Sequence, residues 1–203
     1  MTADCVSPVQ VHHDGSFENG IAWHRLGQAP PYYGAFGEAF SLGPGSITCM
    51  AIWLTRNTQT FGDPSDLYVW SGGVSGEPGS VVAMVPGVAF ENIPVYPDFG
   101  LYLEEVSASV TDEFTVGWWG VWPDRLESYF AATDLDGPVG KPWTCVAPDI
   151  GYPSGWQDPG PVFGLPITSL GIGVGFLPDT PVATRLMSWA RVKVLFDSPT
   201  RAR

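Results

Sequence analysis

Lysine is nearly absent from this chain of 203 residues, which contains only Lys141 and Lys193. Long hydrophobic runs are absent too, and a transmembrane helix needs about 20 consecutive apolar residues. The sequence therefore predicts no membrane span. The formal net charge is −12, and because binding to phosphate groups requires clustered basic side chains, we expect no nucleic acid partner.

Catalytic and metal-binding motifs are missing as well. The chain contains no C-x-x-C pair, no H-E-x-x-H motif and no G-x-S-x-G motif, which are the patterns of zinc or redox sites, metalloproteases and serine hydrolases. We therefore predict a protein that is not an enzyme and needs no cofactor. A metal-dependent hydrolase is kept as the least favoured alternative.

The three cysteines, Cys5, Cys49 and Cys145, are an odd number. One disulfide with one remaining thiol is typical of an exported protein, and three free thiols are typical of the cytosol. The lysine-poor composition, rich in proline and glycine, favours export to the extracellular space or the cell surface. The sequence leaves the pairing open, and we take Cys49–Cys145 as the working assignment. The polar start MTADCVSP contains no secretory hydrophobic region, so we expect a mature form without its signal peptide.

Glycine and proline are abundant, with 25 and 20 copies, and are scattered between short β-rich stretches. Turn signals recur about every 8–15 residues, which is the spacing of an antiparallel sandwich or barrel. The stretch 46–55 is apolar on both faces and indicates a central, doubly buried strand. We predict an all-β, jelly-roll-like antiparallel sandwich over residues 1–178. Its expected strands lie in 46–55, 66–73, 76–95 (two strands, split at Pro86-Gly87), 113–122, 127–137 and 169–178.

Residues 179–203 differ from the rest of the chain in charge. They form a proline-containing linker and a basic segment, whereas the residues before them are strongly acidic. The stretch SWARVKVLF (188–196) alternates like a strand, with a short helix over 184–196 as the competing interpretation. Such a strand can complete a sheet of its own domain or of a neighbouring copy. The expected contact residues of this tail are Arg185, Trp189, Arg191, Val192, Lys193, Val194 and Phe196.

Four stretches resemble the β-sandwich domains of poorly characterised secreted bacterial proteins. They are HHDGSFENGIAW (12–23), YYGAFGEAFSLGPGSI (32–47), DLYVWSGGVSGEPGSVV (66–82) and GYPSGWQDP (151–159). The tail SWARVKVLF is similar to the short end segment that such chains carry. The resemblance covers most of the chain and rests on turns and aromatic residues. It implies a jelly-roll-like sandwich and export, and it implies no activity.

The aromatic residues suggest a second kind of partner. In GWWGVW (117–122), Trp118 and Trp122 share one face of the expected strand, and Gly120 lies between them. Two such rings can stack on sugar rings, and Tyr33 and Trp156 in turn-rich stretches can extend the platform. The alternative is that these rings belong to the core, where tryptophan is mostly buried.

Two acidic or histidine-rich stretches are candidate metal sites. HHDGSFENGIAWH (12–24) contains all three histidines, but Asp14-Gly15 and Asn19-Gly20 are strong turn signals, so we interpret it as structural. Asp134 and Asp136 precede Gly137 as in part of a calcium loop. We expect an Asx turn there, with a structural Ca²⁺ as the alternative.

These observations lead to one main functional prediction. The chain is expected to be an extracellular, non-catalytic structural or adhesive subunit that assembles with other copies, as a filament or surface polymer, through its C-terminal strand. The alternative is a carbohydrate-binding module with polysaccharide as its partner, using the tryptophan and tyrosine platform.

Overall fold

The computed structural model describes residues 5, 8–23, 32–57, 64–122, 129–146 and 154–179. The strands that contain Tyr33 and Trp122 are described, but the side chains of these two residues are not. The linker and tail at 180–203 lie outside the described residues, and so do all seven expected tail contacts. The predictions made for the tail therefore stay predictions.

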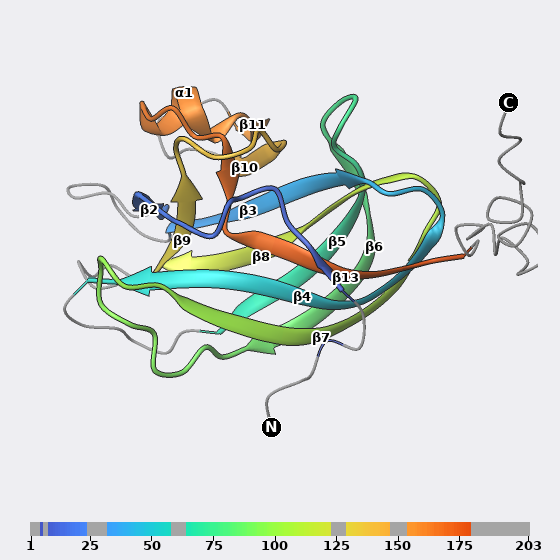
Figure 1. Ribbon diagram of the computed structural model, residues 1–203, viewed down its shortest axis with the longest axis horizontal. Coiled ribbons are helices and arrows are strands. Elements are labelled where there is room, and N and C mark those ends of the chain that lie inside the picture. Colours follow the sequence, from blue (N-terminus) through green and yellow to red (C-terminus); the bar gives the residue numbers. More distant parts are fainter. Residues whose placement is uncertain are drawn as a thin grey trace, which may run out of the picture.

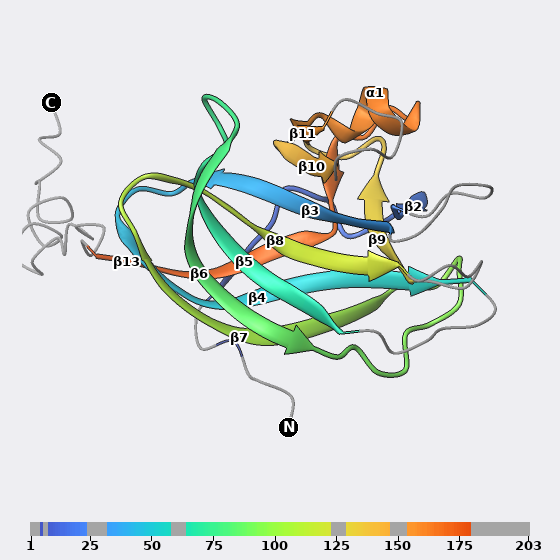
Figure 2. The ribbon, with the colours of Figure 1, turned by 180° about the vertical axis from the view of Figure 1, so that it is seen from behind.

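The strands form two antiparallel sheets packed face to face (Figures 1 and 2). The seven-stranded sheet consists of β1 (Val9–Gln10), β2 (Asn19–Ile21), β4 (Gly45–Arg56), β7 (Gly100–Val110), β9 (Tyr129–Asp134), β12 (Ser169–Leu170) and β13 (Ile172–Pro178). The six-stranded sheet consists of β3 (Tyr32–Ser41), β5 (Ser65–Gly72), β6 (Pro78–Val88), β8 (Glu113–Trp122), β10 (Pro142–Val146) and β11 (Gly155–Gln157). A single turn of helix, α1 (Pro159–Phe163), follows β11. The predicted all-β sandwich is confirmed.

Most of the chain passes from one sheet to the other at each turn. From β3 to β10 the strands alternate between the sheets, except for the hairpin of β5 and β6. The order in the six-stranded sheet is β11-β10-β3-β8-β5-β6, which leaves β6 at an edge. In the other sheet β4 is central, with β7 on one side and β13 and β9 on the other.

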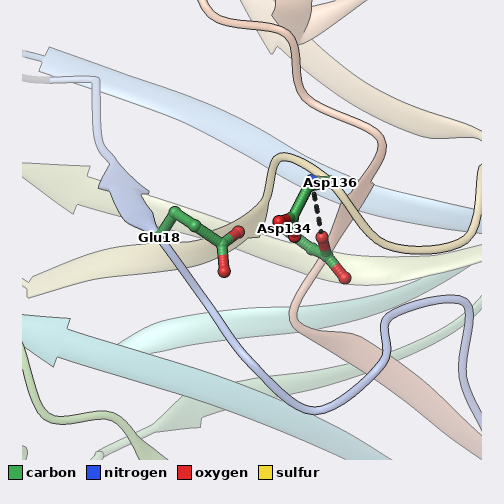
Figure 3. Close-up of side chains that lie close together, drawn as sticks. All are labelled: Glu18, Asp134 and Asp136. Carbon is green, nitrogen blue, oxygen red and sulfur yellow. Dashed lines mark hydrogen bonds between the residues drawn. The ribbon is translucent and has the colours of Figure 1, made fainter.

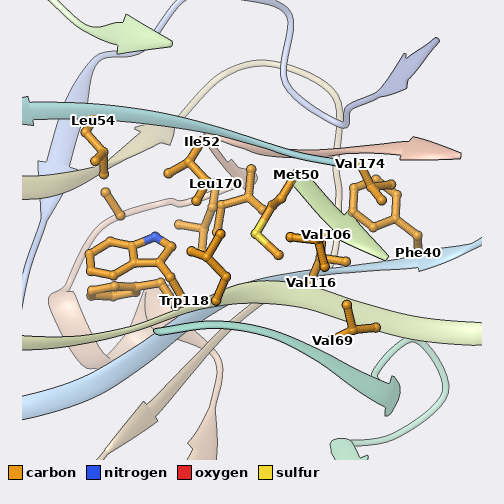
Figure 4. Close-up of a cluster of buried hydrophobic side chains, with 14 of the residues drawn as sticks. Phe40, Met50, Ile52, Leu54, Val69, Val106, Val116, Trp118, Leu170 and Val174 are labelled. Carbon is orange, nitrogen blue, oxygen red and sulfur yellow. The ribbon is translucent and has the colours of Figure 1, made fainter. Parts of the chain in front are cut away.

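One hydrophobic core fills the space between the sheets (Figure 4). Met50, Ile52 and Leu54 of β4 face Trp118 of β8, and all four side chains are completely buried. Alternate residues of a strand point to opposite faces, so the residues between these core positions lie on the outer faces of the sandwich. This alternation decides which aromatic side chains can meet a ligand.

Some expectations about strands need correction. Residues 76–95 contain one strand, β6, which continues through Pro86-Gly87 to Val88 because Ser65 of β5 pairs with Val88 and the Gly87 N–H donates to Asp66 Oδ1 at 2.8 Å. β3, β7 and β10 are not among the expected strands, and in β7 serine and glutamate interrupt the apolar pattern.

The N-terminal segment (residues 8–23) lies along the side of the seven-stranded sheet that β13 and β9 form (Figure 1). β1 pairs with β13 at one end, and β2 pairs with β9 at the other. Between them, His13 lies edge-on to Trp53 of β4 at 4.4 Å between ring centroids, and Phe17 lies 6.0 Å from the same ring. These ring contacts help to bury the outer face of β4, whose sequence predicted burial on both faces.

The disulfide also joins the N-terminal part of the chain to β4. Cys5 is bonded to Cys49 of β4, and their Cα atoms are 5.6 Å apart. The working assignment Cys49–Cys145 is therefore wrong: Cys145 lies on β10 of the other sheet and is a free thiol. Sequence spacing could not reveal this, because the pairing depends on the tertiary structure, which brings Cys5 to β4.

Candidate functional site

The outer face of the six-stranded sheet carries a group of five aromatic side chains, here called the aromatic face. Leu67 and Val69 of β5 belong to the core, so their neighbours on the strand point outward. The same alternation places Trp119, which follows Trp118, on the outer side. Trp143 precedes the buried Thr144 on β10 and also points outward. Trp156 of β11 pairs with Cys145, which lies between the buried Thr144 and Val146, so it points outward as well. The members are Tyr68, Trp70, Trp119, Trp143 and Trp156.

Small residues form the floor beneath these rings. Ala35, Gly37 and Ala39 of β3 lie opposite Trp119, Gly117 and Thr115 of β8. A Cβ atom added to Gly37 would lie 2.8 Å from the Thr115 methyl group and 3.7 Å from the Trp70 ring, so the rings lie close against the strands. The absence of larger side chains leaves room for indole rings to lie over the sheet.

The rings contact one another across the sheet. Tyr68 and Trp70 stack with centroids 5.1 Å apart and planes 14° from parallel. Trp156, from the far edge strand β11, stands edge-on to Trp70 at 4.9 Å and 80°. Trp143 donates its Nε1–H to the Gly73 carbonyl at 2.7 Å, which fixes its orientation. Trp70 and Trp143 are buried beneath this arrangement, while the other three rings are partly exposed.

Polar groups border the aromatic face. Asp66 lies opposite Trp119 in the pairing of β5 with β8. The Lys141 ammonium lies 5.1 Å from the centre of the Trp143 ring, within the range of a cation–π contact. Cys145 pairs with Trp156, and burial raises the pKa of its thiol to about 11, so it is protonated at neutral pH. The face therefore combines exposed ring surface with hydrogen-bonding groups at its margin.

The predicted stacking residues are placed differently from one another. Trp118 is completely buried in the core against Phe36 and Tyr129, so its prediction as an exposed ring is wrong. Trp156 is partly exposed on the aromatic face. The side chains of Tyr33 and Trp122 lie outside the described part, and their role stays a prediction. Alternation in GWWGVW already implied two faces, but only the position of the core identifies Trp119 as the outer residue.

An acidic cluster brings together Asp134 and Asp136 with Glu18, which the sequence did not single out (Figure 3). One carboxylate oxygen from each lies within 4.8 Å of the others. The charge of Glu18 is the largest cause that raises the pKa of the Asp136 carboxyl. Only the folded chain brings Glu18 to this loop, through the Glu18 N–H that donates to the Thr133 carbonyl at 3.2 Å.

Backbone N–H groups already donate to both carboxylate oxygens of Asp134, which is completely buried. Its Oδ1 accepts N–H groups from Asp136 at 3.1 Å and Gly137 at 2.6 Å, and its Oδ2 accepts that of Asp14 at 3.1 Å. These bonds are those of the Asx turn that the sequence favoured. A structural Ca²⁺ at Asp134 and Asp136 stays a prediction.

Glu38 is a second buried carboxylate, and it crosslinks the sandwich. Its Oε1 accepts the Lys141 N–H at 2.6 Å and contacts His12 Nδ1 at 2.9 Å, and its Oε2 accepts the Leu170 N–H at 2.9 Å. Complete burial raises the pKa of its carboxyl, and these hydrogen bonds partly offset that effect. Because Glu38 belongs to β3 and Leu170 to β12, the carboxylate joins the two sheets.

A pocket of about 200 Å³ lies beside β2 and the end of β4 and is lined in part by Arg56, Tyr96 and Phe130. It is smaller than the roughly 300–1,000 Å³ of typical small-molecule sites. Arg56 is held by the chain, since its Nε donates to the Ile93 carbonyl at 2.5 Å and its Nη1 to the Asn57 carbonyl at 3.3 Å. We therefore interpret this guanidinium as a structural contact that holds the loop before β7 in place.

Comparisons of the chain with protein-family models, with curated proteins and with solved structures yield no match. None of the helices in the described part of the chain has the length and hydrophobicity needed to cross a membrane. The aromatic face is thus the candidate site with the most extensive geometric support.

Proposed function

We propose that this protein is an extracellular, non-catalytic carbohydrate-binding domain that holds a polysaccharide against the aromatic face. The observation that carries the proposal is the set of partly exposed rings, Tyr68, Trp119 and Trp156, on the outer face of the six-stranded sheet. Sugar rings present flat C–H surfaces, which pack well on aromatic faces.

The electrostatic surroundings support a neutral glycan. Arg56 and Lys141 are the only arginine and lysine among the described residues, whereas acidic residues occur throughout them. A polyanionic sugar would meet like charge on this surface. Neutral hydroxyl groups can instead accept a hydrogen bond from Lys141 and donate one to Asp66 at the margin of the aromatic face.

Export is supported by the covalent structure. The Cys5–Cys49 bond needs an oxidising compartment to form and persist. Extracellular glycans are present in the same compartment. The disulfide therefore agrees with a role outside the cell, as part of this proposal.

The test is a pull-down of the full chain with insoluble neutral polysaccharides, followed by titration with soluble oligosaccharides of the glycan that binds. Trp156→Ala and Trp119→Ala are expected to weaken binding by about tenfold or more, because each removes a stacking surface worth about 1.4 kcal/mol. Tyr96→Ala is the matched control, since Tyr96 is half-exposed but lies in the loop before β7. Absence of binding to all neutral glycans, or equal affinity for Trp156→Ala and wild type, would contradict the proposal.

A further inference from the structure

The edge strand β6 presents an uncharged, apolar surface to solvent. It pairs with β5 along one side, and no described strand pairs with its other side. No charged residue occurs between Pro78 and Val88. Val81, Val82 and Met84 are 54%, 43% and 49% exposed, although large apolar side chains usually avoid such positions.

Such an edge normally requires protection. An exposed edge offers unpaired N–H and C=O groups to any other strand, and soluble proteins commonly place charged residues there to prevent this pairing. β6 has no such charge, so its composition fits a strand that pairs with a partner. β7 lies at the adjacent edge of the other sheet (Figure 2), where Glu105 is exposed and Glu104 half-buried. The free edge is thus apolar along β6 and acidic beside it.

We infer that the free edge of β6 accepts, as an added strand, the C-terminal segment 188–196 of a second copy of this chain. In this segment Val192, Val194 and Phe196 alternate with Arg191 and Lys193. An added strand gains affinity from main-chain hydrogen bonds and specificity from alternate side chains. Its apolar residues can pack against the exposed valines and methionine of β6, and its cations can pair with the carboxylates of β7.

The lengths and charges of the two partners agree. The segment has about as many residues as β6, which spans 11. Arg56 and Lys141 are the only arginine and lysine in the described part, where acidic residues far outnumber them, so a basic segment meets opposite charge on this surface. Because the donor and acceptor surfaces differ, the contact is head-to-tail and generates filaments or closed rings.

The experiment measures the oligomeric state of the full chain by sedimentation velocity over a range of concentrations, with electron microscopy of the largest species. Wild type is expected to associate, and Val82→Lys to weaken association by about tenfold or more, because a lysine at the edge opposes pairing and repels the basic segment. Val139→Lys is the matched control, since Val139 is 85% exposed in a loop away from the edge. Circular dichroism and thermal melting verify that each variant is folded.

Reversing the charges of the donor provides a second variant that leaves β6 intact. Arg191→Glu combined with Lys193→Glu is expected to weaken association to a similar extent, and salt is expected to weaken that of wild type. Trp156→Ala should leave association unchanged, which separates this inference from glycan binding. A wild type that stays monomeric at all concentrations, or a Val82→Lys variant that associates like wild type, would overturn the inference.

Discussion

The outer faces of the two sheets are covered in different ways. On the seven-stranded sheet, His13 and Phe17 of the N-terminal segment pack on Trp53 of β4, and Cys5 is bonded to Cys49. On the six-stranded sheet, tryptophan and tyrosine side chains of the strands themselves lie over a floor of glycine and alanine. The first arrangement uses aromatic rings as packing surface beneath another segment. The second leaves the rings of Tyr68, Trp119 and Trp156 partly exposed.

The largest difference between the faces is expected from the disulfide. Cys5→Ser should lower the free energy of unfolding by about 4 kcal/mol, because the bond closes a long loop in the unfolded chain. Cys145→Ser on the aromatic face removes only a half-buried thiol and should change it by less than about 1 kcal/mol. Urea denaturation monitored by circular dichroism measures both. Equal losses of unfolding free energy would contradict the expected contribution of the disulfide to stability.

Trp53→Ala should have the next largest effect, a loss of about 2–3 kcal/mol. The Trp53 ring supports both His13 and Phe17, and Phe17 in turn contacts Phe99 at 5.2 Å. Its removal leaves these rings without their packing partner on β4. Thermal and urea unfolding check this value, and glycan affinity should stay as in wild type. A loss of glycan binding would contradict the assignment of the glycan to the aromatic face.

A smaller effect on stability is expected from protonation of His13. Burial lowers the pKa of its imidazole, and the charges of Asp134 and Asp14 only partly oppose this. The folded state therefore favours the neutral ring, so stability is highest above the unfolded pKa of about 6.5 and decreases as the pH falls below it. His13→Phe should reduce the slope of unfolding free energy against pH between about 5 and 7. An unchanged slope would mean that the ring titrates normally in its aromatic surroundings.

A smaller effect on stability than that of Trp53→Ala is expected from Trp156→Ala. This ring is partly exposed, and its edge-on contact with Trp70 is worth about 0.5–1.5 kcal/mol. Measured together with Trp53→Ala, it sharpens the comparison: one tryptophan is expected to affect mainly folding and the other mainly binding. If Trp156→Ala destabilises the protein as much as Trp53→Ala does, the aromatic face is a second packing layer.

The sequence predicted individual strands better than it predicted contacts between residues far apart in the chain. The run Ser46–Thr55 was identified as a doubly buried strand from its apolar residues, and β4 has that environment. The disulfide and the acidic cluster were predicted only in part, because Cys5 and Glu18 reach their partners through the course of the N-terminal segment. These contacts join residues far apart in the chain, and local patterns contain no information about them.

The case of Trp118 and Trp119 shows where the limit lies. The alternation of a strand determines, from the sequence alone, that these neighbouring rings point to opposite faces. It does not determine which face is buried, because either choice satisfies the same alternation. Only the packing of β8 against β4 decided that Trp118 belongs to the core and Trp119 to the surface. The sequence by itself thus determined the sandwich and its aromatic strands, and the tertiary structure decided which aromatic rings are available to a ligand.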